Sequence, residues 1–153
     1  MSVERSYNFR RVSAMLTTSG IVGVERFRGL SAEGYHAVIN LLPDASEYAV
    51  PDEAEIIKAQ GLDYIYIPVD FSCPVQPDYE EFVAAVERLE GKKLHIHCAA
   101  NYRVSVFYAL YAQRSGRWSA AQAGGFVSGL WQPNDVPAWR DFVTRILAHP
   151  PGA

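Results

Sequence analysis

The sequence predicts a single α/β domain with a central, mostly parallel sheet flanked by helices. Short runs of branched and aromatic residues alternate along the chain with segments of helical periodicity, which is the pattern of βαβ units. The 153 residues are 49% hydrophobic and 20% charged, as in an ordinary globular protein. No repeat or linker divides the chain. We therefore expect one domain over residues 1–153, with flexible ends at residues 1–6 and 149–153.

The candidate strands are short and apolar, as buried parallel strands are. They lie at residues 36–42, 64–68 and 93–98, and residues 10–22 are expected to add one or two strands at the edge. Since helical segments separate the later strands, the connections should be crossovers between parallel neighbours.

Two helices are predicted between these strands. The first covers residues 51–60 and ends before Gly61. The second covers residues 77–90, begins with Pro77, carries acidic residues in its first turn and ends at Gly91.

The last third of the chain is predicted to be helical. Residues 104–113 are apolar on every side, which indicates a buried central helix. Ser119 with Gln122 three residues later forms a capping box for the next helix. Asn134 or Asp135 is expected to cap a final helix that has Pro137 in its first turn and runs to about His149.

Charge and cysteine content restrict the class of protein. The net charge is −3 and the arginines are scattered, which argues against a nucleic-acid or membrane-surface binder. Cys73 and Cys98 are too few for a disulfide framework and suit a reducing compartment. The sequence shows neither a signal region nor an apolar run of about 18 residues, so we expect a cytoplasmic protein.

The segment from Lys93 to Ser105 carries the chemistry. A buried strand ends at Cys98 and is followed by a short connection and a buried helix, which places Cys98 where open α/β folds bind ligands. Backbone N–H groups of the turn and of the first helical turn would form an anion cradle there. The predicted cradle comprises Ala99, Ala100, Asn101, Tyr102, Arg103 and Val104. Its field should lower the pKa of Cys98 and make the thiolate nucleophilic, and Arg103 would bind an oxyanion through its forked guanidinium. A buried structural cysteine followed by an exposed arginine is the alternative.

The run His97-Cys98-Ala-Ala-Asn-Tyr-Arg103 resembles the cysteine-dependent protein tyrosine and dual-specificity phosphatases. It is most similar to their small bacterial branch, which is also found fused to β-lactamase-like hydrolases. Residues 34–43, 66–70 and 131–134 extend the resemblance over nearly the whole chain. It implies hydrolysis of phosphotyrosine or another phosphomonoester, on a protein or a small molecule, through a phosphocysteine. Cys98 would be the nucleophile, Arg103 and the loop amides would hold the phosphate or a sulfate-like anion, and no cofactor or metal would be needed.

The same resemblance implies supporting roles for three further residues. Asp70, 28 residues before Cys98, would be the general acid. His97 would position the loop and tune the thiolate, and Ser105 would stabilise the leaving thiolate. Each has a plainer interpretation: Asp70 as a turn residue, His97 as a core histidine like His95, and Ser105 as a first-turn helix residue. His95 and Cys98 should point to opposite faces of their strand, so a zinc site is not expected.

The loop differs from the phosphatase pattern in length, with four residues instead of five between Cys98 and Arg103. This keeps two other functions open: a rhodanese-like sulfurtransferase that carries a persulfide on Cys98, and a non-catalytic phosphate- or anion-binding module. Asn101 stands where such loops often have glycine, and asparagine tolerates positive φ. Tyr102 either lines the rim of the site or packs, Cys73 either pairs with Cys98 or is incidental, and Trp131 and Asn134 receive no role.

Overall fold

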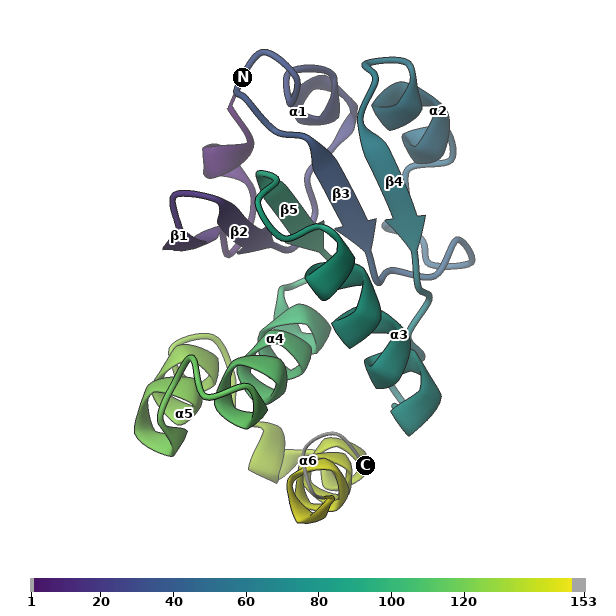
Figure 1. The fold of residues 1–153 in the computed structure, drawn as a ribbon. Helices are drawn as coiled ribbons and strands as arrows, with labels where there is room; N and C mark the ends of the chain where they lie inside the picture. The colour runs from purple at the N-terminus through teal and green to yellow at the C-terminus, as the bar shows by residue number, and fades with distance from the viewer. Residues whose placement is uncertain (1, 150–153) are drawn as a thin grey trace.

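Five strands form one sheet in the order β1-β2-β5-β3-β4 (Figure 1). The computed structural model describes residues 2–149. The strands are β1 (Arg10–Ser13), β2 (Leu16–Ser19), β3 (Ala37–Asn40), β4 (Asp63–Tyr66) and β5 (Leu94–His97). The pair β1–β2 is antiparallel, whereas β2–β5, β5–β3 and β3–β4 are parallel. The predicted, mostly parallel sheet is therefore confirmed, although β2 lies inside the sheet and only β1 is at that edge.

Each helix predicted from the sequence is present, with bounds that differ by a few residues. The helices are α1 (Val24–Arg28), α2 (Glu53–Lys58), α3 (Gln76–Arg88), α4 (Tyr102–Arg114), α5 (Ala120–Ser128) and α6 (Pro137–Ala148). Two 3₁₀ turns, η1 (Val3–Arg5) and η2 (Pro133–Asp135), complete the described elements. The capping box at Ser119 is confirmed, since its hydroxyl accepts from the Gln122 amide and the Gln122 side chain accepts from the Ser119 amide.

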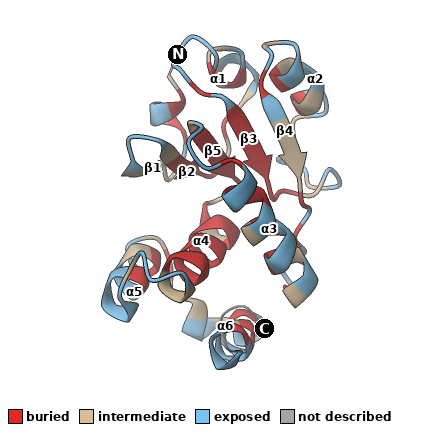
Figure 2. Cartoon of the chain, in the orientation of Figure 1, coloured by how far each residue is buried: buried red, intermediate tan, exposed pale blue. Residues whose placement is uncertain are grey.

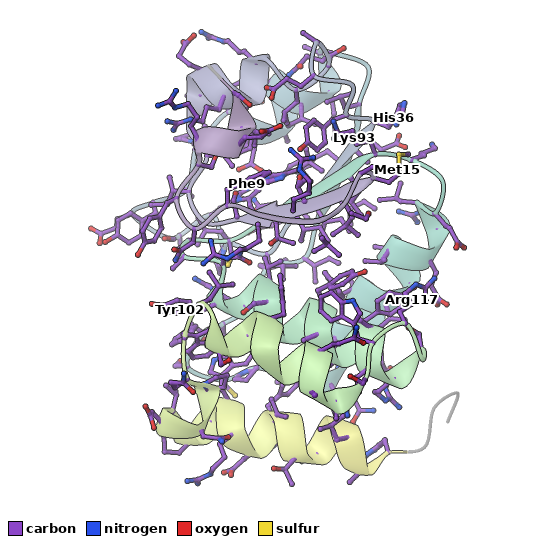
Figure 3. The ribbon with its side chains drawn as sticks, turned by 90° about the vertical axis from the view of Figure 1, so that its left-hand side faces the viewer. Phe9, Met15, His36, Lys93, Tyr102 and Arg117 are labelled. Carbon is purple, nitrogen blue, oxygen red and sulfur yellow. The ribbon has the colours of Figure 1, made fainter. Side chains whose placement is uncertain are left out.

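The sheet separates two apolar cores (Figures 1 and 3). Helices α1 and α2 cover one face, where Phe27, Leu30 and Ile57 form the smaller core. Helices α3, α4, α5 and α6 lie on the other side, around the larger core. Figure 2 shows buried residues concentrated on β3, β5 and α4. Every residue of α4 from Arg103 to Ala112 is buried, which explains why its sequence is apolar on all sides.

One expectation, for the start of the last helix, is corrected. Helix α6 is not capped by Asn134 or Asp135, which lie in η2; its N-cap is Val136, with no side-chain bond. Pro137 at the first position has no N–H to satisfy, so less depends on a cap there. Near the start of the chain, Val3 is fully buried in the smaller core, and the flexibility expected at residues 1–6 and 149–153 stays a prediction.

The remaining terminal residues, 1 and 150–153, lie outside the described part of the chain, and His149 is exposed. Within residues 2–149, none of the helices combines the length and apolar character needed to cross a bilayer.

Candidate active site

Strand β5 delivers Cys98 to the carboxyl edge of the parallel sheet. Its side chains alternate between the two faces: Leu94, Ile96 and then Cys98 belong to the larger core, whereas His95 and His97 point to the α1–α2 side. His95 and Cys98 thus lie on opposite faces, as the strand period predicts. Cys98 is fully buried. Figure 3 shows Tyr102, the first residue of α4, on the opposite side of the view from Lys93, which directly precedes β5.

The connection from Cys98 to α4 leaves several amide groups without a protein partner. In residues 2–149, the N–H groups of Ala99, Ala100, Tyr102, Arg103 and Val104 donate to no other protein atom. Those of the first helical turn are free because a helix leaves its first N–H groups unbonded. Five such donors beside Cys98 are a set that an anion could satisfy.

Asn101 forms the junction between the loop and α4. It is fully buried and adopts the left-handed conformation with φ +66°. Asn101 therefore has the positive φ that the sequence suggests at this position, where such loops often have glycine. Its Nδ2 donates to Asn8 O and to Thr18 Oγ1, both at 2.9 Å, whereas Oδ1 is buried without a partner among the described residues.

Arg103 is buried, with 9% of its surface exposed, and reaches toward the loop after β4. Its Nη1 donates to Val69 O at 2.9 Å, and Cζ lies 5.6 Å from the centre of the Phe71 ring. Nε has no partner within the described chain. The predicted Arg103 is thus at the loop, with Nη1 bonded to Val69 O and Nε uncommitted within the described chain.

Asp70 lies in the same loop after β4 and is exposed. Its Oδ1 accepts from Ser72 Oγ at 2.7 Å and from the Ser72 amide at 2.9 Å. These bonds, and more weakly the charge of Arg103, lower the pKa of Asp70 below its usual value. The carboxyl group is therefore ionised at neutral pH in this structure, and its role as a general acid stays a prediction.

His97 points away from Cys98 and pairs with a carboxylate that the sequence did not suggest. Its Nε2 lies 2.6 Å from Glu53 Oε2, and both side chains are buried. Glu53 is the first residue of α2, and its charge, together with the larger effect of burial, raises the pKa of Tyr64. The other ring nitrogen of His97 lies 3.4 Å from Cys98 O. His97 therefore links α2 to the backbone of the candidate nucleophile.

His95 stands in a second buried chain of hydrogen bonds. Ser19 Oγ donates to Gly20 O at 2.8 Å, so it accepts from His95 Nε2, also at 2.8 Å. Nδ1 then accepts from Thr17 Oγ1 at 2.8 Å, and Thr17 accepts from Tyr35 OH at 2.7 Å. Burial lowers the pKa of His95 well below its usual value, and the neighbouring His97 acts in the same direction. His95 is a neutral structural histidine, in agreement with the plainer interpretation.

Aromatic rings join the Asp70 loop to the start of α4. Tyr102 stacks on Trp131 with ring centres 4.7 Å apart and planes 8° apart, and Phe71 lies 5.6 Å from Trp131. Trp139 Nε1 donates to Phe71 O at 2.7 Å. Ser105 Oγ donates to Tyr102 O and accepts from Trp131 Nε1. Ser105 and Tyr102 are thus used in packing here, and a role for Ser105 toward the thiolate stays a prediction.

The two cysteines are both free thiols, with Cys73 exposed and Cys98 buried. Among residues 2–149, His, Cys, Asp and Glu side chains do not gather in threes as metal ligands would.

Three contributors to the site escaped the sequence analysis. Glu53 is an ordinary first-turn acid in the sequence, and only the packing of α2 on the same side of the sheet as His97 brings the two side chains together. Trp131 lies in the segment 131–134 that resembles the phosphatases, but its contacts with Tyr102 and Phe71 are not evident from the sequence. Gly20 contacts the loop directly: a Cβ there would lie 2.4 Å from Ala99 O. A single sequence does not show these contacts, because each joins distant segments.

Solved structures of known proteins share this fold. A protein from Shewanella putrefaciens CN-32, solved under the name "Putative phosphatase (DUF442)", is 34% identical with a TM-score of 0.86, and the match covers 95% of both chains. Tk-PTP in its active form shares the fold, with a TM-score of 0.75 and 18% identity over 93% of this chain and 97% of its own.

A beta-lactamase hydrolase-like protein of Xylella fastidiosa is 32% identical over 109 residues, which are 69% of this chain and 25% of the relative. The chain thus spans about a quarter of the length of the curated relatives it matches. No protein-family model matches the chain. On the similarity to the Shewanella protein over nearly the full length of both, this chain belongs to the DUF442 family, which has the fold of the protein tyrosine and dual-specificity phosphatases.

Proposed function

We propose that this protein is a cysteine-dependent phosphatase that hydrolyses phosphomonoesters, phosphotyrosine among them, through a phosphocysteine on Cys98. The observation that carries the proposal is the set of unbonded amides of Ala99, Ala100, Tyr102, Arg103 and Val104 beside a cysteine at the carboxyl end of a parallel strand. Peptide N–H groups that are fixed by the fold and free of protein partners suit the equatorial oxygens of a phosphoryl group, on which negative charge is spread during transfer.

In the first step, the Cys98 thiolate attacks phosphorus and the bond from phosphorus to the ester oxygen breaks. The leaving oxygen takes a proton from Asp70, which must be protonated in that complex. The pKa of Asp70 is low in this structure because Ser72 and Arg103 stabilise the carboxylate. A phosphoryl dianion next to Asp70 would oppose both effects and raise that pKa.

In the second step, water attacks the phosphocysteine. Asp70, now a carboxylate, accepts the proton of the water, the bond between sulfur and phosphorus breaks, and phosphate and the thiolate are released. Arg103 would hold the phosphoryl oxygens in both steps. Its Nη1 would exchange Val69 O for a phosphoryl oxygen, and its unpartnered Nε would supply a second donor. Cys98 and Arg103 are both buried, so this exchange would accompany substrate entry.

The test is hydrolysis of p-nitrophenyl phosphate by the native chain and by Cys98→Ser. We expect the variant to lose at least about a thousandfold in kcat, since removal of a nucleophile leaves only the binding contributions. Cys73→Ser is the matched control, because Cys73 is exposed, and should keep full activity. A phosphorylated Cys98 peptide should be found by mass spectrometry after an acid quench.

Two other results would replace the proposal. Transfer of sulfur from thiosulfate to cyanide, without phosphomonoester hydrolysis, would identify a sulfurtransferase. Binding of inorganic phosphate without turnover of either substrate would identify a binding module.

A further inference from the structure

Two asparagines far apart in the sequence hold the Cys98 loop from its outer side. Asn8 Nδ2 donates to Ala100 O at 2.9 Å, and Asn101 Nδ2 donates to Asn8 O at 2.9 Å. The segment before β1 and the loop after β5 thus exchange two hydrogen bonds, one donated by each asparagine. We call this pair of bonds the asparagine clasp.

Both asparagines have backbone conformations that few residues adopt. Asn8 has φ +53° and Asn101 has φ +66°, and within residues 2–149 they are the only residues other than glycine with positive φ. Asparagine adopts positive φ more readily than most residues that have a side chain. Here both such residues lie beside the candidate nucleophile, and Asn101 donates to the backbone of Asn8.

Gly20 completes the support on the same side. Ile21 N donates to Ala99 O at 2.9 Å, and Gly20 N donates to Tyr7 O at 2.8 Å. A Cβ at Gly20 would lie 2.4 Å from Ala99 O and 2.8 Å from Ala100 Cα, and neither of these backbone atoms can move aside as a side chain could. The chain after β2 therefore lies directly against the backbone of the loop.

These contacts orient the peptide groups of the loop. A trans peptide has its C=O and N–H on opposite sides, so fixing one direction fixes the other. The carbonyl of Ala99 is bonded outward to Ile21, which turns the Ala100 N–H inward, where it has no protein partner. The carbonyl of Ala100 accepts from Asn8, and this bond fixes the plane of the peptide group between Ala100 and Asn101.

We infer that Asn8 and Asn101 are positioning residues that preorganise the shortened loop for a tetrahedral oxyanion. The inference rests on the proposed function, since it assigns the clasp to the same anion site. The clasp acts through the backbone and need not touch the anion. It also gives a physical reason for asparagine, rather than glycine, at position 101: glycine allows the same φ but has no amide to donate to Asn8 and Thr18.

The test separates the side-chain bond from the backbone conformation by comparing two variants. Asn8→Gly removes the donor to Ala100 O and permits positive φ, whereas Asn8→Ala removes the donor and strains the backbone. Asn8 is half-buried in a surface segment, so both variants should fold. The probe is inorganic tungstate, bound at a temperature well below each variant's unfolding midpoint. Asn134→Gly, at an exposed asparagine, is the matched control.

For Asn8→Gly we expect tungstate affinity and kcat/KM for an aryl phosphate each to fall about three- to tenfold, the value of one ordinary hydrogen bond. Unchanged affinity in Asn8→Gly, or a loss seen only in Asn8→Ala, would overturn the clasp while leaving the phosphatase intact. A native chain that neither binds tungstate nor hydrolyses aryl phosphates would overturn the proposed function, and the clasp with it.

Discussion

The two faces of strand β5 are built from different chemistry. On the face toward α4, Leu94, Ile96 and Cys98 pack in the larger apolar core. On the face toward α1 and α2, His95 and His97 are equally buried, but their ring nitrogens meet hydroxyl, carboxylate and carbonyl oxygens. One strand therefore carries the candidate nucleophile on an apolar face and two hydrogen-bonded histidines on the other.

The difference between the two faces shows that apolar packing fixes the position of β5, whereas hydrogen bonds fix the orientation of the loop that follows it. Apolar packing is not directional, so it fixes where β5 lies but not how the loop beyond it is turned. Hydrogen bonds are directional, and both histidine networks lead to the loop: the chain through His95 ends at Gly20, and His97 lies against Cys98 O. The face without the nucleophile thus supports the loop, and changes to it should alter stability before they alter the chemistry.

The largest effect should come from removing Glu53. Glu53→Ala leaves a buried ring nitrogen of His97 without its partner at 2.6 Å, and an unsatisfied buried polar group typically costs about 1–3 kcal/mol. Urea unfolding measures the free energy of unfolding. On the apolar face, Ile96→Val should cost only about 0.5–1.5 kcal/mol.

Glu55→Ala is the matched control for Glu53, because Glu55 is exposed on the same helix. If Glu53→Ala destabilises the protein no more than Glu55→Ala does, the supporting role of the histidine face is wrong.

A smaller effect is expected from the titration of His95. Burial holds the folded pKa of His95 far below the unfolded value of about 6.5, so the unfolded chain binds a proton that the folded chain does not. Stability should therefore fall as pH drops below about 6.5, by up to about 1.4 kcal/mol per pH unit from this group. His95→Gln should show a shallower decline, whereas His149→Gln, at an exposed position, should keep the native slope. Equal slopes in all three proteins would show that His95 is protonated in the fold.

The fold could be predicted because its signals are local. Apolar runs marked β3, β4 and β5, and the all-round apolar pattern of residues 104–113 marked the buried α4. The alternation of β5 also placed His95 and Cys98 on opposite faces. A correction came at the start of α6, where Asn134 and Asp135 lie in a 3₁₀ turn and the N-cap is Val136.

The site could be predicted only along its own segment. Cys98, Arg103 and the free amides lie within a few residues of one another, so spacing and strand–loop–helix context reveal them. Asn8 and Gly20 reach the loop, and Glu53 reaches His97 just before it, from three other parts of the chain. Their sequence contexts suit an ordinary turn, loop and helix start equally well. The contacts that orient the loop therefore depend on the topology of the fold, and they cannot be recognised in a single sequence.

The smallest effect should come from the loop after β4, where a substitution should shift the pH dependence of kcat without changing the stability of the protein. Ser72→Ala removes the shorter of the two hydrogen bonds that lower the pKa of Asp70, while the backbone bond remains. The pKa of Asp70 then rises, more of the carboxyl is protonated at each pH, and the limb of kcat that falls with rising pH should move to higher pH by about half a unit.

Phenyl phosphate is the substrate for this test, because its poor leaving group depends on protonation. In an Asp70→Asn background the shift should vanish, and the unfolding midpoint of Ser72→Ala should match the native one because Asp70 and Ser72 are not in the core. A shift that persists in that background would assign the limb to another group, and a lowered midpoint would show that this loop shares the supporting role of the histidine face.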